Sequence, residues 1–189
     1  MLRITNSIYK SLFVFCFISL AVFQPHFKVQ AKALTEGKAI QNNSSPSADK
    51  RFIDNGDETI TDTKTKLMWM KQDSYLRSGH WLHWFESIKY VKQLNDEQFA
   101  NYIDWGLPTI EELKSLYEPE KFNSKQIGRE MKIHIDPIFA KNGSGGHWSI
   151  EKNGVHNAFG LIYNNGSVFS HPKKSRARKA VRAVRRLSN

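Results

Sequence analysis

The sequence contains a single cysteine, Cys16, which lies inside an apolar run near the N-terminus. This excludes a disulfide framework within the chain and a cysteine-based metal cluster. The fold must instead be held by an apolar core, for which 5 Trp, 6 Tyr and 12 Phe residues are available. At 189 residues and 40% hydrophobic content, the chain suffices for one domain and has too many core-forming side chains to be wholly disordered.

Residues 1–31 have the pattern of a secretory signal peptide. Arg3 and Lys10 form a basic head, a run of thirteen residues from Ser11 to Phe23 is apolar, and Val29 to Ala31 offers small residues for cleavage. A membrane anchor is the alternative, but thirteen helical residues span only about 20 Å of a roughly 30 Å hydrocarbon core. We therefore expect export to the periplasm, the cell surface or the medium, with Cys16 removed.

Composition divides the remaining chain into a linker and a domain. Residues 32–50 show no apolar period and include a polar tract, which is typical of a flexible linker. Residues 51–187 are expected to form the domain. Its first part predicts a hairpin over 51–62, turning at Asn55-Gly56, and a third strand over 65–70.

Two helices are predicted next. One covers 81–95, where four apolar residues recur at helical spacing: Trp84, Ile88, Val91 and Leu94. Thr109 to Glu112 is a capping box that opens the second helix. Short strands follow, near Trp148 and up to Phe169, so the elements predict a compact α+β domain.

Several groups of polar residues allow a functional interpretation and a structural one. Oxygen donors in the first hairpin could form a calcium loop, but they lack the EF-hand pattern and a plain hairpin is favoured: Asp54, Asn55, Asp57 and Asp62. A metal site at His80, His83 and Glu86 is conceivable but matches no known metal motif. We expect no metal and no cofactor.

Aromatic and glycine-rich segments were candidates for a binding face. Trp69, Trp105 and Trp148 are expected to pack in the core rather than to stack on sugars. Tyr163 is expected to be an exposed contact near the turn at Asn164-Asn165. The Gly-rich segment 142–147 lacks the Lys-Ser/Thr of a phosphate loop and is predicted to be a mobile surface loop.

Charge is concentrated at the C-terminus. The formal net charge is +10, and residues 152–189 carry nine basic residues and no acidic one. Such a basic run binds polyanions by displacing their condensed counterions, although a solvated tail is the alternative. The expected ligand-binding residues are Lys173, Lys174, Arg176, Arg178, Lys179 and Arg186. Arg182 and Arg185 fall within a predicted closing strand, where they could serve the fold.

Five stretches together resemble the Lcl C-terminal domain family, named for the C-terminal domain of a collagen-like bacterial adhesin. They occur in family order: 51–69 (RFIDNGDETITDTKTKLMW), 104–116 (DWGLPTIEELKSL), 135–139 (IDPIF), 147–149 (HWS) and 181–185 (VRAVR). The chain departs from the family pattern at Gly106, where Arg is usual, and at Val91, where Cys is frequent. The missing Arg puts in doubt any salt bridge that it would make.

The resemblance implies a C-type-lectin-like fold, akin to that of formylglycine-generating enzymes, with paired terminal strands, two flanking helices and long loops. Those enzymes use cysteine thiols, which the mature chain lacks, so we expect no enzymatic activity. The function expected is a secreted, adhesin-like binding domain for anionic glycans or another surface polyanion, rather than nucleic acid. An envelope protein-binding module whose basic tail docks on anionic lipid or lipopolysaccharide is the alternative.

Overall fold

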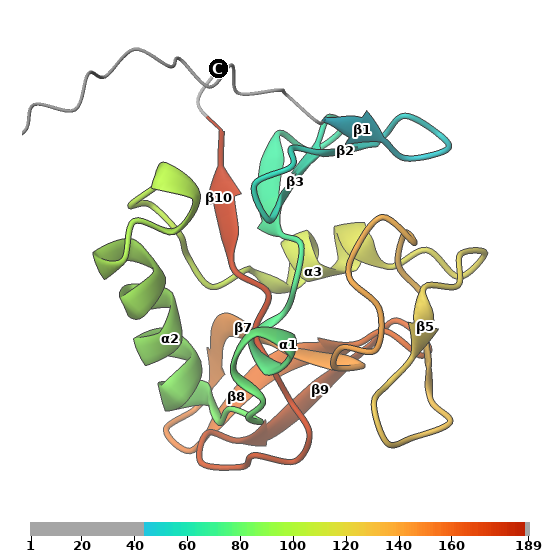
Figure 1. Ribbon diagram of the computed structural model, residues 1–189. Helices are drawn as coiled ribbons and strands as arrows, with labels where there is room; N and C mark the ends of the chain where they lie inside the picture. The colour runs from blue at the N-terminus through green and yellow to red at the C-terminus, as the bar shows by residue number, and fades with distance from the viewer. Residues whose placement is uncertain (1–43, 188–189) are drawn as a thin grey trace, which may run out of the picture. The chain divides into compact units, whose positions relative to one another are not determined.

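The computed structural model describes residues 44–187 of the chain (Figure 1). Within them, three α-helices, a short 3₁₀ helix and ten strands in three antiparallel sheets make an α+β fold, as the sequence predicted. The expected signal peptide lies outside the described residues, as does most of the expected linker. Within residues 44–187, no helix is both long enough and apolar enough to cross a bilayer.

The elements have the following bounds in chain order. The N-terminal part contains β1 (Ser45–Pro46), β2 (Phe52–Asp54), β3 (Thr59–Asp62) and β4 (Leu67–Met70). The middle part contains α1 (Ser74–Ser78), α2 (Trp84–Asp96), η1 (Phe99–Asn101), α3 (Ile110–Leu116), β5 (Ser124–Lys125) and β6 (Lys132–Ile133). The C-terminal part contains β7 (Gly146–Asn153), β8 (Asn157–Ile162), β9 (Ser167–Pro172) and β10 (Val184–Arg186).

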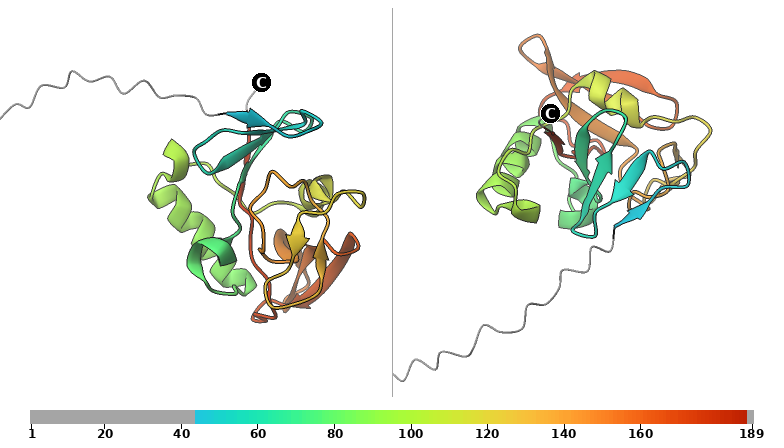
Figure 2. Two further views of the ribbon diagram at one scale, coloured as in Figure 1. Left: turned by 45° about the vertical axis from the view of Figure 1, so that its right-hand side comes forward. Right: turned by 90° about the horizontal axis from the view of Figure 1, so that it is seen from above.

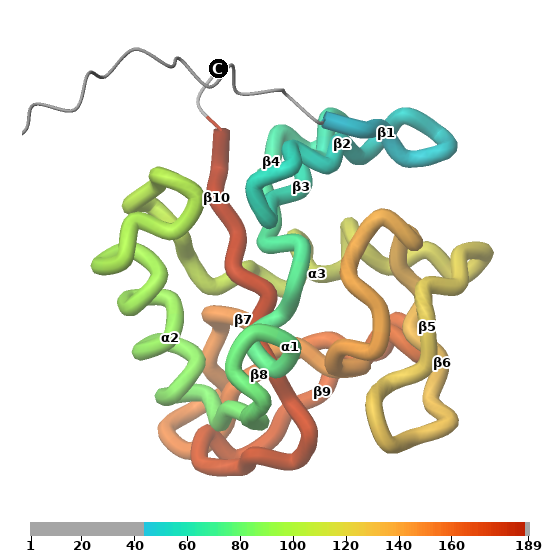
Figure 3. The backbone as a smooth tube through the Cα atoms, viewed as in Figure 1, coloured from blue at the N-terminus to red at the C-terminus, as the bar shows by residue number. Residues whose placement is uncertain are grey.

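The first sheet has the strand order β1-β2-β3-β4-β10, so the last strand of the chain joins the N-terminal hairpin. Val184 pairs with Trp69, and β10 runs antiparallel beside β4 (Figure 3). The predicted hairpin and third strand are confirmed. The N-terminal boundary differs from the prediction, because Ser45 already pairs with Asp54 and the fold therefore begins before Arg51.

Strand β4 is buried on both faces of this sheet. Leu67 and Trp69 contribute to one core cluster, which includes Leu113 and Leu116 of α3. Met68 and Met70 point the other way, as alternation along a strand requires, and belong to a second cluster. The continuous apolar sequence Leu67–Met70 thus fits a central strand with a core on each side.

The three tryptophans of the family motifs lie in the core, as expected. Trp69 and Trp148 are fully buried and Trp105 is nearly so. Trp148 stands on β7 of the third sheet, whose order is β7-β8-β9. In both views of Figure 2, α2 lies on one side of the domain and the β5–β6 hairpin on the opposite side.

The predicted helices are present, but one core assignment is wrong. Thr109 and Glu112 form the expected capping box of α3. On α2, Trp84, Val91 and Leu94 are buried, whereas Ile88 is 37% exposed. Ser87 occupies the buried position instead. An apolar pattern with period 3.6 fits residues 87 and 88 almost equally well, and only packing distinguishes them.

The Gly-rich segment is buried rather than a mobile surface loop, which corrects the sequence prediction. A Cβ added at Gly143 would lie 2.4 Å from Oδ2 of Asp73, and one at Gly145 would lie 2.2 Å from Cε of Met131. The glycines therefore permit close approach of the backbone to neighbouring side chains. Tyr163 is also fully buried, so it cannot be the exposed contact that was expected.

A buried polar cluster centred on Asp73 ties this segment to the rest of the domain. Oδ1 of Asp73 caps α1 by accepting from the backbone N–H of Leu76 at 3.0 Å. Oδ2 accepts from the N–H of Ser144 at 2.6 Å and lies 3.3 Å from Nε2 of His147. Arg182, also buried, donates from Nη1 to the carbonyls of Met70 and Lys71.

The pKa values of this cluster are set by burial and by its charges. Burial alone would raise the pKa of Asp73, but the hydrogen bond with His147 and the positive charge of Arg182 bring it down to about 2. Burial lowers the pKa of His147, and Arg182 adds to this effect. We conclude that the folded state at neutral pH contains a charged Asp73 and a neutral His147.

The acidic side chains of the first hairpin make the interactions of a structural turn. Asp62 accepts from Arg51 and Asp54 accepts from Lys71, both at 2.6 Å. Asp57 accepts from the backbone and side chain of Thr59. In the part of the chain that the structure describes, no three His, Cys, Asp or Glu side chains gather in a way that could hold a metal ion.

The first prediction compares two substitutions on α2. Leu94→Ala removes a side chain that is 1% exposed and should lower the free energy of unfolding by about 2–5 kcal/mol. Ile88→Ala should lower it by only about 1 kcal/mol or less, because that side chain is partly in solvent. Urea denaturation of both variants measures the difference. Equal losses would contradict the assigned face.

The second prediction concerns acid unfolding. Because the unfolded chain takes up protons on Asp73 and His147 before the folded protein does, stability should fall as the pH is lowered, first below 6.5 and then between 3.8 and about 2. Asp73→Asn should be less stable at neutral pH and should lose the second part of this decline. Unfolding free energies measured against pH provide the test, with the exposed Glu111→Gln as the charge-matched control. An unchanged acid decline in Asp73→Asn would contradict the assignment.

Candidate ligand-binding groove

Residues 172–179 form a basic loop between β9 and the segment that leads to β10. The structure divides its cations into two groups. Lys174, Arg176 and Arg178 are exposed, whereas Lys173 and Lys179 are 7% and 3% exposed. The expectation of an exposed contact surface is therefore wrong for these two lysines, because both side chains are buried.

Lys173 has a structural role at the tip of the β7–β8 hairpin. Its Nζ donates to the carbonyls of Gly154 and Val155 at 3.0 and 2.6 Å. The ammonium also lies 5.5 Å from the ring centroid of Trp84, within reach of a cation–π interaction. The burial of this lysine is thus compensated by backbone acceptors, a contact that sequence alone could not place.

Arg185 and Arg186 of β10 each form an ion pair with a carboxylate on another segment. Nη2 of Arg186 donates to Glu112 at 2.7 Å, so it pairs with the carboxylate that caps α3. A Cβ at Gly106 would lie 3.2 Å from Nη1 of Arg186, which shows that the small residue leaves room for this arginine. Arg185 pairs with Asp104 and lies over the ring of Tyr102.

Arg176 fastens the basic loop to the start of α2. Its guanidinium makes a two-pronged ion pair with Glu86, with Nε 3.0 Å from Oε2 and Nη2 bonded to Oε1. Glu86 also accepts from the backbone N–H of His83, which completes a capping box at the helix N-terminus. The hydrogen bond from Arg176 is the main reason that the pKa of Glu86 falls to about 2.

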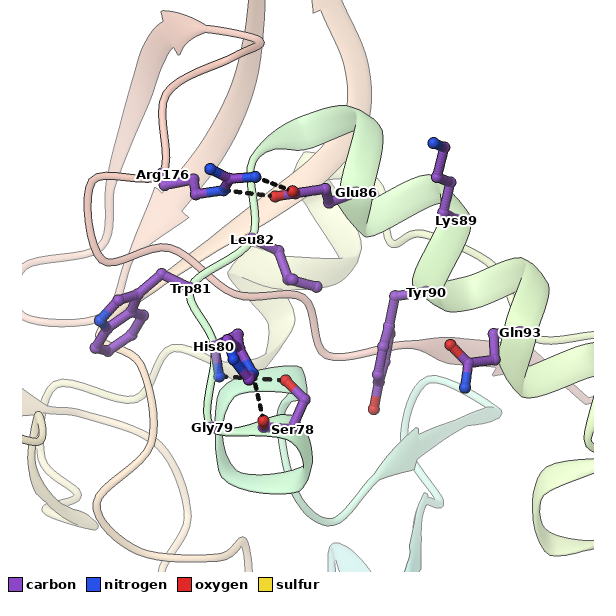
Figure 4. Close-up of a pocket in the computed structure, with 10 residues that line it drawn as sticks. All are labelled: Ser78, Gly79, His80, Trp81, Leu82, Glu86, Lys89, Tyr90, Gln93 and Arg176. Atoms are coloured by element: carbon purple, nitrogen blue, oxygen red, sulfur yellow. Dashed lines mark hydrogen bonds and ion pairs between the residues drawn. The ribbon is translucent and has the colours of Figure 1, made fainter.

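A groove of about 620 Å³ lies beside this ion pair, between the segment 78–82 and α2. We call it the aromatic groove, and its lining is drawn in Figure 4: Ser78, Gly79, His80, Trp81, Leu82, Glu86, Lys89, Tyr90, Gln93 and Arg176. In that view the Leu82 side chain points across the groove toward Tyr90, and the Arg176–Glu86 pair closes one end.

Three local interactions fix the walls of the aromatic groove. Gly79 ends α1 in the left-handed conformation with φ of 73°, which turns the chain toward His80. The Trp81 ring stacks on Tyr75, with centroids 3.9 Å apart. The N–H of Leu82 donates to the carbonyl of Lys179 at 2.9 Å, which places the segment against the basic loop.

The groove combines apolar surface with polar and charged groups. Tyr90 offers a ring face, and burial raises the pKa of its phenol, which stays protonated. Lys89 is exposed at the rim and has no carboxylate partner among the described residues. Gln93 and His80 add hydrogen-bonding groups. Such a lining suits a ligand with both apolar faces and anionic or hydroxyl groups.

Of the six residues that the sequence singled out, only Arg176 lines this groove. The sequence analysis missed Tyr90, Lys89 and Leu82, because each lies on a segment that was assigned to the core or to a plain helix. The sequence did contain one signal for this site, a basic residue, Lys89, close to the apolar residues Ile88 and Val91. His83 and Glu86 are engaged in capping α2, and Nδ1 of His80 instead lies 2.6 Å from the carbonyl oxygen of Ser78.

The domain just described is a small α+β scaffold with a preformed groove and a basic rim. The sequence model of the Lcl C-terminal domain family matches residues 58–185, and the chain belongs to this family. The family is thus associated with adhesins, as the sequence motifs indicated. No curated protein matches the chain closely enough to count as a relative.

The third prediction uses two neighbouring lysines as a matched pair. Lys173→Ser removes two hydrogen bonds from a buried ammonium group to backbone carbonyls and should lower the free energy of unfolding by about 1–3 kcal/mol. Lys174→Ser removes the same charge from an exposed position and should change it by about 0.5 kcal/mol or less. Thermal and urea denaturation check both values. Equal stability of the two variants would contradict the structural role of Lys173.

Proposed function

We propose that the protein is an exported, non-enzymatic binding domain that recognises anionic glycans. The aromatic groove binds the sugar rings, and two exposed cations in its lining, Lys89 and Arg176, hold the anionic groups. The observation that carries the proposal is the position of Arg176, which belongs both to the basic loop and to the lining of the groove.

The chemistry of a charged sugar fits this arrangement. A pyranose ring has an apolar face that packs against aromatic side chains, while its hydroxyls need hydrogen-bonding partners at the edge. Tyr90 and Leu82 offer apolar surface for the ring, and Gln93 and His80 offer hydrogen-bonding groups for the hydroxyls. Lys89 and Arg176 lie at the rim, where a sulfate or carboxylate group remains partly solvated.

Export and family membership support the same proposal. The pattern of residues 1–31 predicts a signal peptide, and the family is named for an adhesin domain. The sulfated polysaccharides bound by that adhesin are an analogy for the ligand class. Adhesion requires recognition without chemistry, and the mature chain expected after cleavage has no cysteine nucleophile.

A second function, docking on an anionic lipid surface or an envelope protein, is favoured by a separate observation. Phe85 and Val155 are 41% and 82% exposed, and they line a smaller hollow together with Pro172 and Lys174. Apolar side chains next to a cation suit the boundary of a membrane. An apolar contact with a protein at this surface would persist at high salt, whereas polyanion binding would weaken steeply.

The fourth prediction tests the groove with heparin oligosaccharides as the probe. Lys89→Gln should weaken binding and reduce its salt dependence, because one fewer counterion is released for each complex. Lys64→Gln removes the same charge from an exposed position on the first sheet and serves as the matched control. Titrations at several salt concentrations, followed by tryptophan fluorescence, measure both effects.

The fluorescence signal provides a further control, because Trp81 is one of the residues that line the groove. Trp81→Phe should remove most of the binding-induced change while the protein remains folded by circular dichroism. Equal weakening in Lys89→Gln and Lys64→Gln would contradict the groove. A glycan array on which sulfated and uronic-acid glycans bind no better than neutral ones would contradict the ligand class.

A further inference from the structure

A second hollow, of about 420 Å³, lies on another side of the basic loop. It is enclosed by the loop, by the turn between β5 and β6, and by the third sheet. Its polar lining consists of Gln126, Arg129, His171, Arg178 and Lys179. The turn and the loop are joined directly, because Nη1 of Arg178 donates to the carbonyl of Gly128 at 3.1 Å.

Charge in this hollow is all of one sign. Four of its lining residues carry permanent or titratable positive charge, and no acidic residue lines it. Among the residues that the structure describes, Arg129, Arg178 and Lys179 make no ion pair with a carboxylate. Like charges gathered without a counter-charge repel one another, so an anion would relieve the repulsion.

Lys179 is the most unusual member. It is 3% exposed, and its Nζ lies 2.9 Å from Nδ1 of His171 and 3.3 Å from the carbonyl of Ala177. The ammonium also lies 4.8 Å from the ring centroid of Phe169. Lysines are rarely buried without an acidic partner, because desolvation of the charge is costly.

Titration of the hollow follows from this burial. Burial lowers the pKa of Lys179 to about 8. Burial and the charge of Lys179 both lower the pKa of His171. The other charged groups that line the hollow are the guanidiniums of Arg129 and Arg178. A bound anion would favour the protonated forms of Lys179 and His171, so its affinity should fall as the pH rises through 8.

Gln126 supplies independent evidence for a ligand. It is 2% exposed, and its Oε1 accepts from the backbone N–H of Gly145 at 3.0 Å. Its Nε2 is buried and has no hydrogen-bond acceptor among the described residues. Buried donors are nearly always satisfied, and an anion oxygen in the hollow would accept from this one.

The backbone at Arg178 is also held in an uncommon conformation. Its φ is 52°, in the left-handed region that side chains other than those of Gly, Asn and Asp seldom adopt. Such conformations are concentrated where a side chain is positioned for binding. Here the turn brings the guanidinium to the rim of the hollow, opposite the side of the loop where Arg176 meets Glu86.

We infer that this hollow is a binding site for a tetrahedral oxyanion, the sulfate or phosphate group of a small ligand or of a sugar. Five polar side chains from three separate segments line it, which suits a group with oxygens in several directions better than a planar one. The remaining volume can admit part of the molecule that carries the group. This site is separate from the aromatic groove and does not depend on the glycan proposal.

The fifth prediction tests the site with inorganic ions. Sodium sulfate or phosphate at millimolar concentration should raise the melting temperature at pH 7 more than sodium chloride of equal ionic strength. In Arg129→Gln/Arg178→Gln, the apparent affinity should fall about tenfold or more. Lys64→Gln/Lys141→Gln removes two exposed charges elsewhere and should behave as the wild type.

Sulfate also serves for the pH test, since it does not titrate in this range. Its stabilising effect should shrink between pH 7 and pH 9 as Lys179 loses its proton, and Lys179→Met should abolish both the effect and its pH dependence. If Lys179→Met does not fold, the double arginine variant decides the matter, because both of its side chains are exposed. An equal response to chloride, or an unchanged response in the double arginine variant, would overturn the inference.

A final comparison distinguishes a sulfate or phosphate group carried by a sugar from a free ion. Glucose 6-sulfate and glucose 6-phosphate should bind more tightly than the inorganic ions if the hollow holds a sugar-borne group, and no more tightly if it holds a free ion. Both results support the oxyanion site. Because inorganic sulfate and phosphate carry no sugar ring for the aromatic groove, failure of the ion titrations leaves the heparin titration unaffected, and failure of that titration leaves this site standing.

Discussion

The carboxylate of Asp73 is the interaction on which the rest of the structure depends. It caps α1, accepts from the backbone of the Gly-rich segment at Ser144 and lies against His147 of β7. The nearby cation of Arg182 holds the strand β4 by its carbonyls. Since a buried carboxylate is stable only when its hydrogen bonds and charge are compensated, these four segments must assemble together.

This arrangement also explains how a fold without disulfides supports the two proposed binding sites. The segment after α1 leads directly into one wall of the aromatic groove, and the Gly-rich segment leads into the third sheet beside the oxyanion hollow. Both walls are therefore anchored to the same buried centre. The basic loop lies between the two sites, and its hydrogen bonds to Leu82 and Gly128 fix it on both sides.

The basic run has two functions that its sequence does not distinguish. Lys173 and Lys179 are buried among aromatic rings, where their long apolar stems pack and their ammonium groups meet carbonyls or a histidine. Arg176 and Arg186 are paired with carboxylates that cap helices. A positive charge in such a run is thus available to a ligand only where the fold leaves it exposed or unpaired.

The sequence by itself determined the elements that local chemistry controls. The turn at Asn55-Gly56 and the capping box at Thr109 depend on nearby residues alone. The continuous apolar run Leu67–Met70 forms a strand that is buried on both faces. The core positions of Trp69, Trp105 and Trp148 were also predicted from the sequence, since each tryptophan lies within a family motif. Burial of these side chains is required in any compact arrangement of the domain.

Tertiary structure alone decided the rest. The choice between Ser87 and Ile88 for the core, the burial of Tyr163 and the close packing at Gly143 each depend on a segment far along the chain. Glu86 meets Arg176 across ninety positions, and the C-type-lectin-like detail of the fold stays a prediction from resemblance. Neither proposed site could be predicted as a whole from sequence, because its walls come from separate segments whose proximity is set by long-range packing.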